Sequence, residues 1–387
     1  MSAVEVLRYD SVDTQRVPSA LNTVKPKVIS PREDSLIPFP SSLHSELCWS
    51  YNSFTPRDYV VQFTDEELIS IDHAVASFKE LRLPDIALVC PENFPLPAEL
   101  GKKLRDVSTT LHNGRGFVVL RGLSLESHPE EDAVIAFCGI SSYIGRERCT
   151  NDNGIAMDHL RDASRDEKPT GREGVELHPS KMMAPLKFHA DRKFADILAL
   201  YVKSKAATGG DQYLSSAWQV YNDMMKLCPD ALRILAEDFP WPGVVNDQPE
   251  TTYTPVLFQK DGRLFCQLVY RIFEGTNLLT STQWKALDLL ESFANENAIK
   301  LDVQVGDIQL VNNFALLHAR RGWVDRPNRE RHYYRLGLRD PENAWARPVK
   351  YEAIFDDHLK TPPEDQMIPV KDFDPYGLTS LGQGGHG

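Results

Sequence analysis

Residues 186–191 read Leu-Lys-Phe-His-Ala-Asp, and an apolar run, Asp-Ile-Leu-Ala-Leu-Tyr-Val, follows at 196–202. The imidazole of His189 and the carboxylate of Asp191 are two positions apart, and in an extended chain positions i and i+2 point to the same side. The two side chains can therefore face one point in space, as two ligands of a single metal ion must. Such a pair alone is a weak indication, because the same spacing also suits solvated or hydrogen-bonded core residues.

His318 is the best candidate for a third ligand. It follows the segment GDIQLVNNFALL at 306–317, which predicts a strand that ends in a polar corner. Two imidazoles and one carboxylate on one face of an ion leave three coordination positions open, which is typical of non-haem Fe(II) oxygenases. The mirrored pair Glu176-Leu-His178 offers His178 as a rival ligand. That assignment is less favoured, because the strand pattern accompanies His189 and not His178.

A further segment with strand-like alternation is RHYYRLGLR at 331–339. Arg331, Tyr333, Arg335 and Arg339 share one face of it. One interpretation is an edge strand whose basic face lies in water. The other is that this face looks into a barrel, where a guanidinium grips a carboxylate with two parallel hydrogen bonds. Four strand rises separate Arg331 from Arg335, roughly 13 Å between backbones, so each arginine more easily holds a different anion.

Composition and charge limit the classes of partner. The 387 residues carry a formal net charge of −12, which makes nucleic acid and anionic membranes poor candidates and favours a small-molecule substrate. The six cysteines form no CxxC pair, and the N-terminus does not resemble a signal peptide. The apolar runs are too short to span a bilayer. We expect a cytoplasmic protein, and its oligomeric state stays open.

The chain is predicted to be mainly β with flanking helices, in the form of a barrel or sandwich. An extended or partly disordered arm is expected at 1–60, a single domain at 61–345 and a C-terminal extension at 346–387. Residues 145–185 are expected to form long loops over the site. Helices are predicted at 64–78, 97–114, 129–144 and 281–294. Strands are predicted at 116–120, 194–202, 255–259, 263–270, 303–311 and 331–339.

Several motifs together resemble the taurine dioxygenase and clavaminate synthase-like family. They are FHAD at 188–191, AATGGD at 206–211, GDIQLVNNFALLHAR at 306–320 and the Arg331–Arg335 pair, with GRGFVVLRGL at 114–123 and NDNGIAMDHLRD at 151–162 upstream. The resemblance spans roughly residues 65–345. It implies a double-stranded β-helix (jelly-roll) core that uses Fe(II), 2-oxoglutarate and O₂. It also implies oxidation of a substrate C–H bond, with succinate and CO₂ as co-products.

Individual residues can also be given expected roles, some from the strand pattern and some from the resemblance. Arg331 is expected to bind the distal carboxylate of 2-oxoglutarate, and Arg335 to assist it or to bind an acidic group of the substrate. Gln212 stands where relatives often carry a hydroxyl residue that touches 2-oxoglutarate, and an amide can donate to a carboxylate there. Asn153 is expected to contact substrate by analogy with relatives. Trp323 either closes the pocket or packs beneath it.

Other interpretations stay open at this point. A zinc-dependent hydrolase would use the same three ligands, and a cupin-like binding protein would have lost catalysis. Asn312 and Asn313 are expected to tie the corner before His318 through side-chain-to-backbone hydrogen bonds. The substrate is expected to be a carboxylate-bearing metabolite or an amino acid. Hydroxylation, desaturation and cyclisation all remain possible outcomes.

Overall fold

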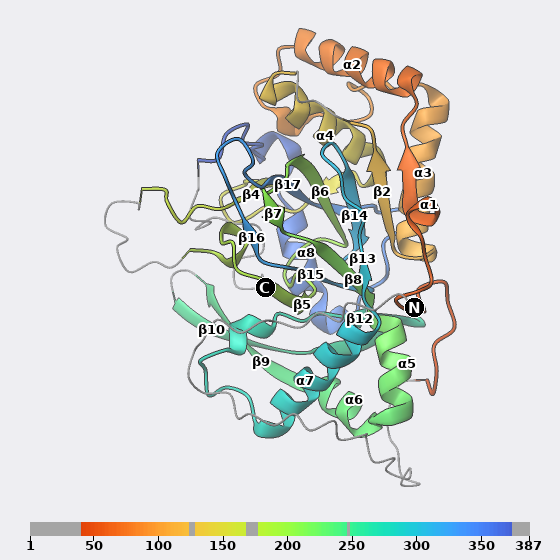
Figure 1. Cartoon of the computed structure of the whole chain (residues 1–387), viewed down its shortest axis with the longest axis vertical. Helices are drawn as coiled ribbons and strands as arrows, with labels where there is room; N and C mark the ends of the chain where they lie inside the picture. Colours follow the sequence, from red (N-terminus) through yellow and green to blue (C-terminus); the bar gives the residue numbers. More distant parts are fainter. Residues whose placement is uncertain (1–39, 124–127, 168–176, 246–247, 374–387) are drawn as a thin grey trace.

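A computed structural model describes residues 40–123, 128–167, 177–245 and 248–373. Its centre is a seven-stranded sheet in the order β1-β2-β14-β6-β17-β3, with β4 paired to β17 (Figure 1). The strands of this larger sheet are β1 (Val60–Gln62), β2 (Phe117–Arg121), β3 (Glu147–Arg148), β4 (Met157–Arg161), β6 (Ile197–Ser204), β14 (Ile308–Asn312) and β17 (His332–Arg339).

A four-stranded sheet in the order β13-β8-β15-β5 lies opposite the larger sheet. Its strands are β13 (Ile299–Lys300), β8 (Gln212–Ser216), β15 (Leu316–Arg320) and β5 (Leu186–His189). In the antiparallel pair of β15 and β5, His318 lies directly opposite His189. The two sheets therefore enclose a space whose wall carries both imidazoles, and this is the mainly β arrangement predicted from the sequence.

Alternation along β6 shows how the larger sheet separates two cores. Leu198 and Leu200 face the smaller sheet, whereas Ile197, Ala199 and Tyr201 pack against helices on the other side. Those helices are α2 (Asp65–Glu80), α3 (Ala98–Asn113) and α4 (Glu130–Ile144). Because both faces of the sheet are covered, its central strands are apolar on both sides. Figure 1 shows these helices at the top of the molecule.

A second helical group, in the lower part of Figure 1, packs beside the smaller sheet. It consists of α5 (Ala217–Leu227), α6 (Pro229–Leu235) and α7 (Ser281–Glu296). Helix α7 starts with a capping box, in which Thr280 and Gln283 satisfy each other's backbone N–H groups. Helix α2 starts in the same way, with Thr64 and Glu67, as the sequence predicted for Thr64.

Shorter elements complete the described chain. They are the hairpins β9 (Asp238–Val245) with β10 (Gln248–Pro255) and β11 (Leu257–Lys260) with β12 (Arg263–Cys266), the pair β7 (Thr208–Gly209) with β16 (Trp323–Val324), the helices α1 (Pro56–Tyr59) and α8 (Glu352–Asp356), and 3₁₀ turns at Ile86–Leu88, Pro179–Lys181, Tyr270–Phe273, Val349–Tyr351, Asp357–Leu359 and Pro363–Asp365. Every helix in the described ranges is too short or too polar to cross a lipid bilayer.

Both ends of the described chain pack onto this body. Leu47 and Trp49 of the expected N-terminal arm are buried in the core beside the smaller sheet, while residues 1–39 of that arm lie outside the described residues. At the other end, residues 363–373, here called the C-terminal strap, run along β4. Met367 exchanges backbone hydrogen bonds with the segment at 154–156, and Asp372 forms ion pairs with Arg161 and Lys181.

Two expectations need correction. Residues 145–185 were expected to be loops, but 157–161 form β4 between β17 and the strap. The strand predicted at 263–270 ends at Cys266, and Tyr270–Phe273 turns into a 3₁₀ helix. The pairing of β12 with β11 ends before Gln267, and the side chain of Gln267 donates to Thr254 and to the carbonyl of Pro255.

Candidate metal centre

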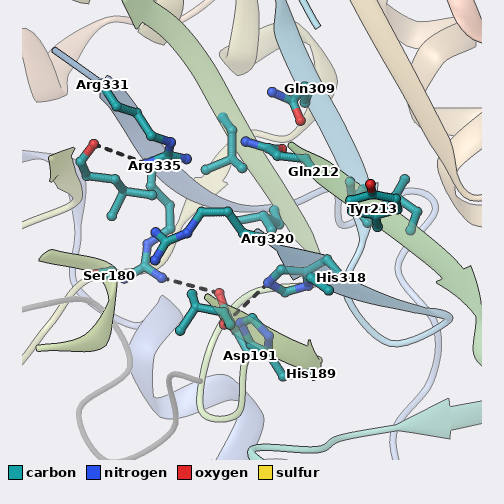
Figure 2. A pocket seen from close by; sticks show the side chains of 17 residues that line it. Ser180, His189, Asp191, Gln212, Tyr213, Gln309, His318, Arg320, Arg331 and Arg335 are labelled. Carbon is teal, nitrogen blue, oxygen red and sulfur yellow. Dashed lines mark hydrogen bonds and ion pairs between the residues drawn. The ribbon is translucent and has the colours of Figure 1, made fainter. Parts of the chain in front are cut away.

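Three predicted ligands meet at one point of the enclosed space. The ligand atoms of His189, Asp191 and His318 all lie within 4.8 Å of one another. Asp191 Oδ1 is 3.7 Å from Nε2 of His189 and 3.8 Å from Nε2 of His318. Figure 2 shows the carboxylate beside both imidazoles at the base of the pocket. All three groups come from one corner, since β5 and its following residues supply two of them and β15 the third.

The chain conformation at this corner is fixed by two asparagines. Asn313 accepts a hydrogen bond from the backbone N–H of Asp191 and donates to the carbonyls of Asp191 and Ala195. Asn312 accepts from the backbone N–H groups of Phe314 and Ala315. Asn312 thus holds the turn just before His318, as expected from the sequence, whereas Asn313 connects this turn to the segment that carries Asp191.

The chemistry of the donor set fits a divalent metal ion. His189 Nδ1 lies 2.8 Å from the carbonyl oxygen of Lys187, which can only accept, so Nδ1 carries the proton and Nε2 keeps its lone pair. A backbone carbonyl that fixes the tautomer in this way is the usual partner of a metal-ligating histidine. Two imidazoles and one carboxylate on one side of an ion also leave positions open on the other side.

The pocket at this corner lies between the two sheets and has about 640 Å³ of empty space, including solvent at its mouth. Seven of its seventeen lining residues are aliphatic, and both sheets supply them. The lining residues are Leu160, Ser180, Leu186, His189, Asp191, Leu198, Leu200, Gln212, Tyr213, Leu214, Gln309, Val311, His318, Ala319, Arg320, Arg331 and Arg335. Three guanidinium groups therefore enter a space that is otherwise mainly apolar (Figure 2).

Two of these arginines are buried without a carboxylate. Within the described ranges, no Asp or Glu lies at ion-pair distance from Arg320 or Arg331. Their guanidinium carbons lie 4.1 Å and 4.9 Å from the ring centroid of Trp323. Burial lowers the pKa of both, and for Arg320 the neighbouring charge of Arg331 lowers it further. The pocket thus holds positive charge that calls for an anion.

Arg335 is different, because it lies between two carboxylates. Its Nε donates to Asp158 Oδ2 at 3.1 Å and its Nη2 donates to the same oxygen, while its Nη1 is 3.4 Å from Asp191 Oδ2. Burial alone would lower the pKa of Arg335. The negative charges of Asp158 and Asp191 outweigh this effect, so the pKa is raised. The arginine next to the predicted metal ligands is therefore already neutralised.

The remaining predicted residues divide into two groups. Gln212 lines the pocket, directly opposite Arg320 in the pair of β8 and β15, and Trp323 packs buried beside the two unpaired arginines. The structure does not bring Asn153 to the pocket, since it is exposed in a turn where its N–H donates to Asn151. His178 bonds to Ser180 and is absent from the metal cluster. Its sequence partner at 176 lies outside the described residues.

Sequence reasoning missed Arg320 and the pairing of Asp158 with Arg335, since it considered Asp158 only as a residue of the substrate entrance or of a loop hydrogen bond. The signal for Arg320 was present, because it lies two residues after His318 on a strand and so shares the ligand's face. Its Nη2 donates to the carbonyls of Met182 and Ala184, which fixes the segment that covers this side of the pocket. Asp158 had no such signal, because it reaches Arg335 only through the pairing of β4 with β17.

Comparison with known proteins agrees with the geometry. The family model described as "Taurine catabolism dioxygenase TauD, TfdA family" matches residues 79–336. The chain is 32% identical over 323 residues to the taurine hydroxylase-like protein SAT17 of Stachybotrys chartarum, covering 79% of this chain and 82% of that protein. It is 25% identical over 254 residues to FR-33289 synthase of Streptomyces rubellomurinus, covering 62% and 73%.

Solved structures share the fold at low sequence identity. Asparagine oxygenase, in complex with Fe(II), hydroxyasparagine and succinate, gives a TM-score of 0.58 at 15% identity, with 80% of this chain and 98% of that chain covered. The non-haem iron oxygenase OrfP, in complex with Fe and alpha-ketoglutaric acid, gives 0.55 at 13% identity, with 80% and 99% covered. The double-stranded β-helix predicted from the sequence is confirmed by these neighbours. The chain therefore belongs to the TauD, TfdA family of Fe(II)- and 2-oxoglutarate-dependent oxygenases.

Proposed function

We propose that His189, Asp191 and His318 hold the Fe(II) of this oxygenase and that Arg331 binds the distal carboxylate of 2-oxoglutarate. The observation that carries the proposal is the pairing of two features in one pocket. Three ligand atoms within 4.8 Å of one another lie at its base, and a buried guanidinium without a carboxylate at ion-pair distance among the described residues lines the same pocket from just before the start of β17. Arg331 precedes Arg335 by four residues, roughly 13 Å along a strand, which leaves room for a short dicarboxylate between metal and arginine.

Each part of the pocket has a task in this proposal. When bound, iron supplies the O₂-dependent oxidation, coupled to decarboxylation of 2-oxoglutarate to succinate and CO₂. Arg331 orients the cosubstrate through two parallel hydrogen bonds, and Gln212 donates from the neighbouring wall. Leu198, Leu200 and the other aliphatic residues exclude water, so the charges within the pocket act in a low dielectric.

We infer that the substrate is a small molecule, an amino acid or another carboxylate-bearing metabolite. The structural neighbours support this class, since one is an asparagine oxygenase and OrfP was crystallised with L-Arg and its hydroxylated products. Family membership favours the oxygenase over the zinc hydrolase and the binding protein that the sequence left open. The oxidation consumes one O₂ and one 2-oxoglutarate for each substrate molecule.

The test is a panel of amino acids and small carboxylic acids incubated with Fe(II), 2-oxoglutarate and O₂. Succinate formation that depends on one panel member supports the proposal. The product mass then identifies the outcome, since hydroxylation adds one oxygen atom, and desaturation or cyclisation removes two hydrogens. A zinc hydrolase predicts no succinate and no O₂ consumption. Substrate turnover without either would contradict the proposed function.

A further inference from the structure

Arg335 and Asp158 form a cross-strand ion pair at the edge of the pocket. They lie directly opposite each other in the antiparallel pairing of β17 with β4. Both side chains are nearly inaccessible, at 5% and 7% exposure. Two nitrogens of the guanidinium bond to Asp158 Oδ2, so the plane of the guanidinium is fixed as well as its position.

The strand that carries Asp158 is held from its other side. Side chains alternate along β4, so Asp158 and Leu160 face the pocket while His159 and Arg161 face the C-terminal strap. His159 Nε2 lies 3.0 Å from the carbonyl oxygen of Pro369, and Arg161 Nε is 2.7 Å from Asp372. Asp158 is therefore a fixed support for Arg335, because β4 is pinned between β17 and the strap.

The third nitrogen of Arg335 reaches a predicted metal ligand. Its Nη1 is 3.4 Å from Asp191 Oδ2, while the other oxygen, Oδ1, faces the two imidazoles. Figure 2 shows Asp191 between Arg335 on one side and the histidines on the other. Asn313 fixes the backbone of Asp191, whereas Arg335 contacts its carboxylate directly. The contact with Arg335 therefore acts on the orientation of the group that faces the metal.

We propose that Arg335 is a positioning residue of the metal centre, held in place by Asp158, and that it presents Asp191 to the metal through a single oxygen. The inference rests on the proposed metal site. It replaces the expectation that Arg335 binds an acidic group of the substrate. Since two carboxylates already share this guanidinium, a substrate needs no anionic group at that position.

The distribution of charge in the pocket supports this division of roles. Arg335 is balanced by Asp158 and Asp191, whereas Arg320 and Arg331 have no carboxylate within ion-pair distance among the described residues. An anion that enters the pocket therefore gains more by binding beside Trp323, where the two uncompensated arginines lie. Anion binding and metal positioning are thereby assigned to different arginines of the same pocket.

The test is a titration of the metal-free full-length protein with Mn(II), in which calorimetry measures the binding affinity. Mn(II) is used because it does not react with O₂ during the titration. Arg335→Gln and Asp158→Asn are each expected to weaken Mn(II) binding by about 10- to 100-fold, the usual cost of losing a partner of a metal ligand. The double variant is expected to lose less than the product of the two single effects, because both act through one contact. Arg335→Lys keeps the charge and is expected to recover part of the loss.

A matched control separates positioning from stability. Arg121 forms a comparable paired contact with the buried Asp307 on the same sheet, and neither residue lines the pocket. Arg121→Gln is expected to lower the unfolding temperature while leaving Mn(II) affinity unchanged. In the Co(II)-loaded protein, Arg335→Gln is also expected to change the visible absorption, since that spectrum responds to the coordination number and geometry of the metal.

Wild-type Mn(II) affinity and an unchanged Co(II) spectrum in Arg335→Gln would overturn the inference. An equal loss of affinity in Arg121→Gln would also overturn it, since the effect would then follow stability. Failure of the proposed metal site gives a different result, because the wild-type protein would then bind no Mn(II), or His189→Ala would bind it equally well.

Discussion

Replacing Arg331 by Met separates the stability of the fold from its capacity to bind 2-oxoglutarate. Arg331 is buried, has no carboxylate at ion-pair distance within the described chain, and lies close enough to Arg320 to lower that residue's pKa. A buried charge without a partner costs free energy, and an apolar side chain of similar length removes that cost. The metal-free variant is therefore expected to be as stable as the wild type, or more stable by about 1–2 kcal/mol.

Binding of 2-oxoglutarate should change in the opposite direction. Loss of one partner of a buried charge pair costs about 2–4 kcal/mol, which weakens binding by roughly 30- to 1,000-fold. At a 2-oxoglutarate concentration 100 times the wild-type Kd, the ligand stabilises the wild type by about 2.7 kcal/mol. With a Kd about 100-fold weaker, the same concentration stabilises Arg331→Met by only about 0.4 kcal/mol.

The assay is urea unfolding with Mn(II) bound, in the presence and absence of 2-oxoglutarate, and without metal. Arg335→Met is the comparison, because it removes the guanidinium that two buried carboxylates share, and it should lose about 3–5 kcal/mol without any ligand. Two results would refute the reasoning. One is a metal-free Arg331→Met protein destabilised as strongly as Arg335→Met, and the other is a variant that keeps the full 2-oxoglutarate stabilisation.

Three further predictions concern the supports of the site. Burial raises the pKa of Glu291 to about 7, above its unfolded value, so its contribution to stability is lost as pH rises through about 4.5 to 7. Glu291→Gln should therefore raise the free energy of unfolding by about 2 kcal/mol at pH 8 but not at pH 4.5, as denaturant titrations at both values will show. Asp372→Asn removes the carboxylate paired with buried Lys181 and should speed proteolysis of the strap. A variant cleaved at the same rate as the wild type would contradict this prediction. Asn313→Ala loses three bonds to the corner that carries Asp191 and should cost about 2–4 kcal/mol of stability; a loss below about 0.5 kcal/mol would contradict that role.

The sequence was most informative where local geometry decides the outcome. The i, i+2 spacing of His189 and Asp191 determines that they share a side once the segment is extended, and no long-range information is needed. Asn312 acts on the neighbouring backbone of Phe314 and Ala315, so its role in the corner was also predictable, whereas the bonds of Asn313 to Asp191 and Ala195 join segments distant in the sequence. The helices α2 and α7 begin at their capping residues for the same reason.

What the sequence did not predict depends on contacts between distant segments. Strand β4 reads Met-Asp-His-Leu-Arg, with polar residues on both faces, because one face pairs with Arg335 and the other with the strap. Such a strand lacks the apolar alternation by which strands are recognised. Arg331 and Arg335 look equivalent in the sequence, and only the position of Asp158 distinguishes the neutralised arginine from the uncompensated one.

The most direct test of the metal site is anaerobic addition of Fe(II) and 2-oxoglutarate to the purified protein, monitored by visible absorption. If His189, Asp191 and His318 bind Fe(II) and leave adjacent positions open, a metal-to-ligand charge-transfer band should grow to saturation at one iron per chain. The same titration of His189→Ala should give no band. An unchanged band in His189→Ala, or no band in a wild-type protein that binds both components, would contradict the proposed centre.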